Sequence, residues 1–229
     1  GGYGSARILD KLDYEYIASH PKLVVGFSDV TALQIALWEK CHLVTANGPL
    51  MVTLGGSDAY TAGQFFKGLT TDAWQGPLAL PAGRKLTTVV PGQAEGPIVG
   101  GNLTVLTSLV GTPYALDGTG CILVLEDTGE DAYRIDRMLN QLWQSGLLSR
   151  VAAIAYGDFT DCPNDPGDFT TDQVLDYYAH LAGKPAIKGL PVGHTKDKAF
   201  VPYGVKVRLD ADGEGASLTF IDVCGIRPL

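Results

Sequence analysis

The sequence of 229 residues lacks several features that would assign it to a functional class at once. No stretch approaches the ~18 consecutive apolar residues that a membrane-spanning helix needs. Basic residues are also few, with 17 Lys and Arg against 25 Asp and Glu, so the formal charge is −8. No run of Lys and Arg offsets this balance, which makes nucleic acid and anionic membrane poor candidate partners.

Cysteine is scarce and widely spaced. The four cysteines form no Cys-x-x-Cys pair, which argues against a zinc knuckle or a redox motif; they are Cys41, Cys121, Cys162 and Cys224. Because a chain of this length can bury a core without disulfides, we expect free thiols in a reducing compartment. An initiator methionine is also absent. The opening Gly-Gly-Tyr-Gly is typical of a loop interior, and we expect that an N-terminal portion is missing.

The first part of the chain alternates strand and helix signals. Strands are predicted at 22–26 and 43–46, and helices at 9–18, 31–40, 61–68 and around Trp74. This order is typical of a parallel sheet covered by helices.

A stretch rich in Gly and Pro follows, from Gly76 to Gly101, and we interpret it as a linker into a second domain. Beyond it, strands are predicted at 121–125 and 150–156, helices at 132–144 and 171–182, and a closing hairpin around 210–215. The predicted organisation is an N-terminal domain over 1–76, a linker over 77–97 and a C-terminal domain over 98–229.

Ser28 lies on a predicted strand-to-helix turn in the segment Val-Val-Gly-Phe-Ser-Asp-Val-Thr. Gly26 permits a tight turn that exposes the serine hydroxyl, and the N–H of Asp29 at the helix start can hold a developing oxyanion. A simple helix N-cap is the alternative interpretation, since Ser and Asp both favour that position. Val30 stands where the general nucleophile-elbow pattern has glycine.

A serine nucleophile needs a base and a carboxylate that orients the base. Of the four histidines, His194 is the best placed, because it follows a short apolar run in a loop; the others are His20, His42 and His180. Glu126 directly follows a predicted buried strand, where a carboxylate needs a partner. Asp127 and Glu130 are equally good candidates on this reasoning, and a solvated acidic turn before the next helix is a further alternative.

Six segments, in this order, resemble the LD-carboxypeptidase family, the serine peptidases that include the microcin C immunity peptidases. They are G-G-Y-G-S-A-R-I-L-D-K-L-D-Y (1–14), K-L-V-V-G-F-S-D-V-T-A-L (22–33), N-G-P-L-M (47–51), G-G-N-L (100–103), L-E-D-T-G-E-D-A-Y-R-I-D-R-M-L (125–139) and G-L-P-V-G-H (189–194).

The resemblance implies that Ser28 is the nucleophile, His194 the general base and Glu126 the residue that orients it. It implies an oxyanion hole formed by the N–H groups of Asp29 and Gly2. It also implies an α/β fold, with a flavodoxin-like N-terminal domain that is incomplete here and a C-terminal domain mixing β-sheet and helices. The active site is expected at the interface between the two.

The activity that the resemblance implies is release of the terminal D-alanine from murein tetrapeptides during cell-wall recycling. It further implies a cytoplasmic homodimer that needs no metal or cofactor. The alternatives are a microcin-immunity-type peptidase acting on aminoacyl-nucleotide analogues and an inactive muropeptide-binding protein. Ser28 and Glu126 are 98 positions apart, which favours the shorter carboxypeptidase form.

Three further residues are candidate substrate contacts, namely Asn102, Tyr133 and Arg137. A carboxypeptidase must recognise a free carboxylate, and arginine is the usual means. Arg134 and Arg137 lie close after Glu126 in the sequence. The alternative is that both arginines form ordinary ion pairs with acidic neighbours on a helix surface, and this interpretation is favoured.

Overall fold

The computed structural model describes residues 1–70, 74–212 and 215–221, which form two sheets with helices around them. The strands are β1 (Val25–Gly26), β2 (Thr45–Asn47), β3 (Gly76–Pro77), β4 (Thr87–Val90), β5 (Gln93–Asn102), β6 (Ile122–Thr128), β7 (Ala153–Thr160), β8 (Ala186–Lys188), β9 (Val201–Tyr203), β10 (Lys206–Asp210) and β11 (Ser217–Phe220). The helices are η1 (Ser5–Lys11), α1 (Tyr14–Ser19), η2 (Ser28–Val30), α2 (Thr31–Cys41), α3 (Met51–Leu54), α4 (Ala59–Thr70), α5 (Leu103–Ser108), α6 (Ala132–Gln144), α7 (Leu147–Arg150) and α8 (Thr171–Ala182).

The centre of the larger sheet is a block of parallel strands in the order β5-β6-β7-β8. Successive side chains of β6 enter opposite cores: Leu123 and Leu125 belong to one, Ile122 and Val124 to the other. A parallel strand buried on both faces requires such a continuous apolar run. Because the carboxyl ends of parallel strands meet at one edge, β6 delivers Glu126 there, directly opposite Asn102 of β5.

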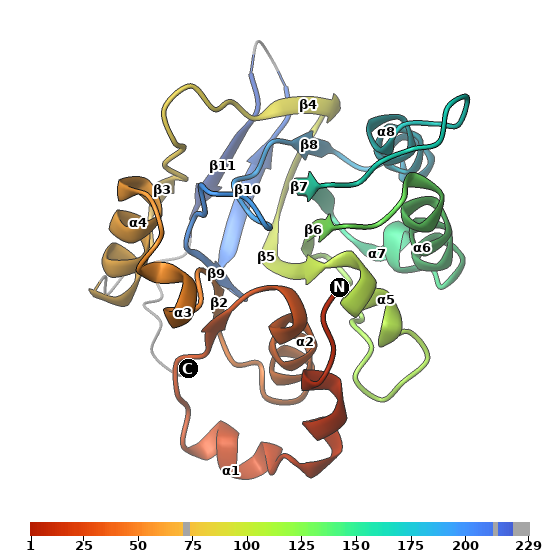
Figure 1. The fold of residues 1–229 in the computed structure, drawn as a ribbon. Coiled ribbons are helices and arrows are strands. Elements are labelled where there is room, and N and C mark those ends of the chain that lie inside the picture. Colours follow the sequence, from red (N-terminus) through yellow and green to blue (C-terminus); the bar gives the residue numbers. More distant parts are fainter. Residues whose placement is uncertain (71–73, 213–214, 222–229) are drawn as a thin grey trace.

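Two hydrophobic layers cover the faces of this sheet. Helices α2, α5, α6 and α8 contribute to the first core, with α6, α7 and α8 together on one side of the molecule (Figure 1). The second core contains residues of α4, β9, β10 and β11, and Figure 1 shows α3 and α4 on the opposite side of the molecule from α6 and α8. Within the described ranges, every helix is too short or too polar to cross a membrane.

The smaller sheet brings together early and late parts of the sequence. Its strands β1 and β2 are parallel, and β9, from the last third of the sequence, pairs antiparallel with β2. The register places Ala46 opposite Pro202 and Asn47 opposite Val201. The segment that precedes β9 is therefore held beside the turn that follows β1.

The predicted α/β class is confirmed, and several elements agree closely with expectation. Helices α6 and α8 have the predicted bounds, α2 and α4 differ by only a few residues at their ends, and β10 and β11 form the predicted hairpin. The predicted helix at 9–18 is instead split into η1 and α1. The side chain of Asp13 accepts a hydrogen bond from the N–H of Tyr16 at 2.9 Å, so it caps and starts a new helix.

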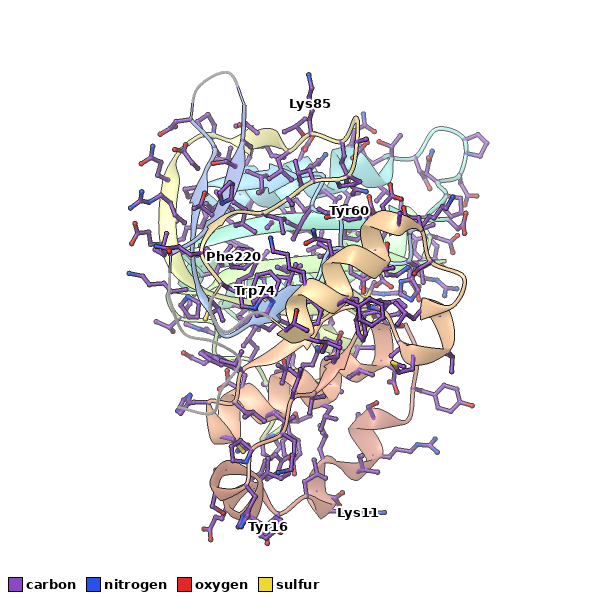
Figure 2. All side chains as sticks on the ribbon, turned by 90° about the vertical axis from the view of Figure 1, so that its left-hand side faces the viewer. Lys11, Tyr16, Tyr60, Trp74, Lys85 and Phe220 are labelled. Carbon is purple, nitrogen blue, oxygen red and sulfur yellow. The ribbon has the colours of Figure 1, made fainter. Side chains whose placement is uncertain are left out.

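Trp74 lies in no helix, contrary to the prediction. Its ring stacks on Phe200 with centroids 5.6 Å apart and lies 5.4 Å from the ring of Phe220, which is its neighbour in Figure 2. Burial of a large aromatic ring therefore determines the path of the chain at this point.

The segment 77–97, expected as a linker, contributes strands to the larger sheet. β4 pairs with β8, and β5 begins at Gln93 and pairs with β10. Long-range pairing of this kind leaves no local periodicity beyond short β-prone pieces. The domain boundaries themselves stay a prediction.

The predicted free thiols are confirmed for Cys41, Cys121 and Cys162. Cys224 lies outside the described residues. Burial raises the pKa of the Cys121 thiol to about 11.

Replacing Leu139 by Ala should lower the free energy of unfolding by about 2–5 kcal/mol, because this fully buried side chain of α6 would leave a cavity in the first core. Urea denaturation followed by circular dichroism measures the change. Gln141→Ala, on the exposed face of the same helix, is the matched control and should stay within about 0.5 kcal/mol of the parent. Equal losses in both variants would contradict the assigned packing of α6.

Candidate active site

Ser28 sits on a sharp turn between β1 and α2. Its φ angle is 62°, in the left-handed region that residues with a side chain rarely occupy. Gly26 makes room for the turn, because a Cβ there would lie 2.8 Å from Cγ1 of Val30. Neither Ser28 nor Asp29 caps a helix: η2 and α2 have Phe27 and Val30 at their N-cap positions, without a side-chain cap.

A chain of two hydrogen bonds links three side chains that are far apart in the sequence. His194 Nε2 lies 3.0 Å from Ser28 Oγ, and His194 Nδ1 lies 3.0 Å from Glu126 Oε2. Glu126 is fully buried, while His194 is about a quarter exposed. The structure thus separates the acidic candidates that sequence reasoning left open, because Glu126 is the one bonded to the imidazole.

Glycines give the Glu126 side chain its space. A Cβ on Gly157, in the neighbouring strand β7, would lie 3.1 Å from Cβ of Glu126. A Cβ on Gly193 would lie 3.3 Å from Glu126 Oε2. Because neither glycine has a side chain, the Glu126 carboxylate has room to contact the imidazole of His194. Glu126 Oε1 is buried and has no hydrogen-bond partner among the described residues.

Asp127 is also fully buried, but its carboxylate is held in a different way. It accepts hydrogen bonds from Asn102 Nδ2 at 2.8 Å, from Thr104 N at 2.9 Å, from Thr104 Oγ1 at 2.7 Å and from Thr128 N at 2.9 Å. The carboxylate oxygens are therefore satisfied by these donors, and neither of them is bonded to the histidine. Asp127 therefore ties β6 to the start of α5.

Asn102 is buried beside this carboxylate rather than open to solvent. Its Oδ1 accepts from Val105 N at 3.1 Å and so caps α5, while its Nδ2 donates to Asp127. A substrate contact was expected from this residue. Its observed contacts are those of a helix cap.

Gly2 and Asp29, the two residues of the expected oxyanion hole, lie against each other. A Cβ on Gly2 would be 2.8 Å from Cβ of Asp29, so only glycine fits at this distance. The Asp29 carboxylate accepts from Ser5 N at 2.9 Å and from Ser5 Oγ at 2.8 Å. These bonds hold the Gly-rich loop beside the first turn after Ser28, where backbone N–H groups lack partners within the helix.

The remaining expected substrate contacts lie on the exposed face of α6. Arg134 is 3.5 Å from Glu130 and 3.4 Å from Asp131, so the interpretation as a helix-surface ion pair is confirmed for it. Arg137 lies over the ring of Tyr133, 5.6 Å from its centroid.

Sequence reasoning missed the residues that surround His194. The ring of Phe27 contacts the imidazole edge to face, with centroids 5.0 Å apart. The ammonium group of Lys198 lies 5.1 Å from the centre of the Phe27 ring and donates to the carbonyl of Thr195. Burial lowers the pKa of Lys198. The only signal in the sequence was the position of Lys198 four residues after the histidine.

This geometry suits acyl transfer by a serine. A histidine within hydrogen-bond reach can take the proton of the hydroxyl, and a buried carboxylate on its other nitrogen fixes the tautomer. Within the described residues, no group of three His, Cys, Asp or Glu side chains is placed to hold a metal ion.

Comparison with known proteins identifies the family. Residues 1–48 match the LD-carboxypeptidase N-terminal domain and residues 95–209 match the LD-carboxypeptidase C-terminal domain. The chain belongs to the LD-carboxypeptidase family. The two matched regions contain Ser28 and the Glu126–His194 pair, respectively.

Curated proteins are similar over most of this chain. A probable murein peptide carboxypeptidase of Bacillus subtilis is 38% identical over 92% of the chain, which spans 66% of that protein. The murein tetrapeptide carboxypeptidase of Pseudomonas aeruginosa is 33% identical over 93% of the chain and 71% of its own length. The microcin C7 self-immunity protein MccF of Escherichia coli is 30% identical over 96% of the chain and 72% of its own length.

Solved structures of similar proteins have the same fold. Muramoyltetrapeptide carboxypeptidase from Oxalobacter formigenes superimposes with a TM-score of 0.84 at 33% identity, covering 98% of this chain and 77% of that one. An MccF-like protein from Bacillus anthracis gives 0.83 at 28% identity, covering 97% and 74%.

Replacing Asp127 by Asn should lower the free energy of unfolding by about 2–4 kcal/mol, since an amide nitrogen would face N–H and O–H donors in a buried place. Chemical denaturation measures the loss. Asp168→Asn, in an exposed loop, is the control and should be nearly neutral. An Asp127→Asn variant as stable as the parent would show that the four hydrogen bonds contribute little.

Proposed function

We propose that this protein is a serine carboxypeptidase that removes the terminal D-alanine from murein tetrapeptides, with Ser28, His194 and Glu126 as its catalytic triad. The observation that carries the proposal is the chain of two 3.0 Å hydrogen bonds from Ser28 through His194 to Glu126. The substrate class is supported by the membership of this protein in the LD-carboxypeptidase family and by relatives named murein peptide carboxypeptidase.

The first step forms an acyl-enzyme. Ser28 Oγ attacks the carbonyl carbon of the L-centred residue that precedes the terminal D-alanine, while His194 Nε2 accepts the hydroxyl proton. The tetrahedral intermediate collapses, the bond from carbon to the D-alanine nitrogen breaks, and His194 returns the proton to the leaving amine. Water then attacks the ester by the same route in reverse, which frees Ser28.

Glu126 stabilises the charged form of His194 during both steps. Its Oε2 accepts the Nδ1–H bond, which leaves Nε2 free to accept the proton of Ser28. We infer that the N–H groups of Gly2 and Asp29 bind the oxyanion, because the contact between these two residues brings their backbones to one place beside Ser28.

Several finer points stay predictions. Tyr133 and Arg137 remain candidate substrate contacts. They lie against each other in the first two turns of α6, which follows β6 in the chain, and both side chains are exposed. The cytoplasmic location, the homodimer and the independence from metal and cofactor follow from the family resemblance alone.

The parent protein should release one D-alanine from murein tetrapeptide, detected as a loss of that residue by mass spectrometry. Ser28→Ala should reduce the rate at least about 10⁴-fold, because no other hydroxyl in the described structure is bonded to His194. The variant should retain the folding stability of the parent, which urea denaturation checks.

Other outcomes of this experiment favour the alternatives. An intact tetrapeptide together with cleavage of an aminoacyl-sulfamoyl nucleotide would favour the immunity-type activity, because a relative of that type is 30% identical to this chain. If neither compound is cleaved and a fluorophosphonate fails to label Ser28, the protein would be a muropeptide-binding protein without catalysis.

Glu126→Gln should slow both D-alanine release and fluorophosphonate labelling by roughly 10³–10⁴-fold, since a neutral amide cannot stabilise the imidazolium. Steady-state release of D-alanine at saturating tetrapeptide gives kcat, and KM should change little; the time course of fluorophosphonate labelling gives the reactivity of Ser28. Glu130→Gln is the matched control, because Glu130 lies in the same loop and pairs with Arg134 instead of the histidine. Comparable losses in the two variants would argue against Glu126 as the orienting residue.

A further inference from the structure

The loop that carries His194 is a closed structure with few internal supports. The N–H of Ala199 donates to the carbonyl of Pro191 at 2.7 Å and closes the loop at its base. Inside it, Thr195 Oγ1 donates to the carbonyl of Asp197 at 3.0 Å, and the ammonium group of Lys198 donates to the carbonyl of Thr195. None of these bonds fixes the loop relative to the domain that carries Ser28.

Thr61, in the first turn of α4, supplies that connection. Its hydroxyl donates to the carbonyl of Lys196 at 3.1 Å and accepts from the N–H of Lys198 at 2.9 Å. Both contacts are to backbone atoms, so they fix the path of the loop whatever its side chains are. The loop lies 135 residues away in sequence, and Thr61 is 1% exposed.

The support is itself rigid. Asp58 Oδ1 accepts from the N–H of Thr61 at 2.8 Å, which caps the start of α4. Farther along the helix, Phe65 and Gly68 pack against Phe200, which follows the loop. Figure 2 shows α4 in the foreground, with Tyr60 labelled in its first turn, and the Tyr60 hydroxyl donates to the carbonyl of Ala79 at 2.7 Å.

The carboxyl groups of Asp58 and Asp197 interact at the same place, which raises the pKa of Asp197 and lowers the pKa of Asp58. The attachment of the loop to the first turn of α4 is made by the two backbone bonds of Thr61.

We propose that Thr61 is a positioning residue that holds His194 at hydrogen-bond distance from Ser28 through its two bonds to the loop. The inference rests on the proposed triad. The position of His194 matters because proton transfer needs hydrogen-bond distance to Ser28. A displacement of about 1 Å at a catalytic group costs roughly 10²-fold in rate. Without the hydroxyl, the loop would lose its backbone attachment to α4, and the imidazole would sample positions away from the serine.

The test compares Thr61→Val with Thr61→Ser in the otherwise intact protein. Valine keeps the shape of threonine and removes both hydrogen bonds, whereas serine keeps the hydroxyl. We expect Thr61→Val to lower kcat for tetrapeptide about 10-fold or more with KM within about twofold of the parent, and to slow fluorophosphonate labelling of Ser28 equally. Thr61→Ser should restore most of both rates.

A matched control is available in the same helix. The hydroxyl of Thr70 donates to the carbonyl of Phe66 at 2.8 Å, inside α4 and away from the loop, so Thr70→Val should leave both rates unchanged. Each labelling rate is divided by the final amount of labelled protein, so that unfolded protein, which does not react, does not affect the comparison. If Thr61→Val does not fold, Thr61→Ala gives the same comparison with Thr61→Ser.

Labelling of Thr61→Val at the parental rate would overturn the inference, and so would a loss in Thr61→Ser as large as that in Thr61→Val. The probe needs only an activated serine, so it separates this question from the substrate. A parent protein that reacts with the probe and leaves the tetrapeptide intact would count against the proposed substrate, while the comparison of Thr61 variants would still decide the role of Thr61. A parent protein that the probe does not label would remove the triad and this inference together.

Discussion

The pairing of β9 with β2 is the contact on which the candidate site depends. Ser28 and His194 are 166 residues apart, so a 3.0 Å bond between them requires that the chain be closed over a long distance. β9 begins a few residues after His194, and β2 lies beside the strand that leads into Ser28. Once the three-stranded sheet has formed, the loop that carries the histidine starts from a place near Ser28, and contacts such as the two bonds of Thr61 complete its placement.

Two adjacent carboxylates at the edge of β6 illustrate how burial distinguishes a structural acid from a reactive one. Asp127 receives four hydrogen bonds, so its charge is satisfied in the resting protein. Glu126 has one bonded oxygen, shared with His194, and one oxygen without a described partner. Glu126 is therefore the acid whose carboxylate can orient the imidazole, as the proposed mechanism requires, whereas the carboxylate of Asp127 is already occupied by its own donors.

Helices α6 and α8 could be predicted to the residue because their signals are local. Apolar spacing defines α6, and α8 is bounded by a capping box of Thr170 with Gln173 and by a left-handed Gly183. The short strands and the course of the chain at Trp74 depend on partners distant in sequence, which no local pattern records. The choice of Glu126 over its acidic neighbours needed the family resemblance. Thr61 gave no signal, because a threonine near a helix start is common.

The turn at Ser28 also explains a departure from the general elbow pattern, in which glycine stands two residues after the nucleophile. A left-handed backbone at a residue with a side chain costs roughly 1–3 kcal/mol and persists only where the surroundings enforce it. Here Val30 is tolerated because Gly26 faces it without a side chain, at a distance where a Cβ would be 2.8 Å from the valine. The close approach of strand and helix that the elbow needs is therefore provided by the glycine before the serine, and the position after it is free to carry an apolar side chain.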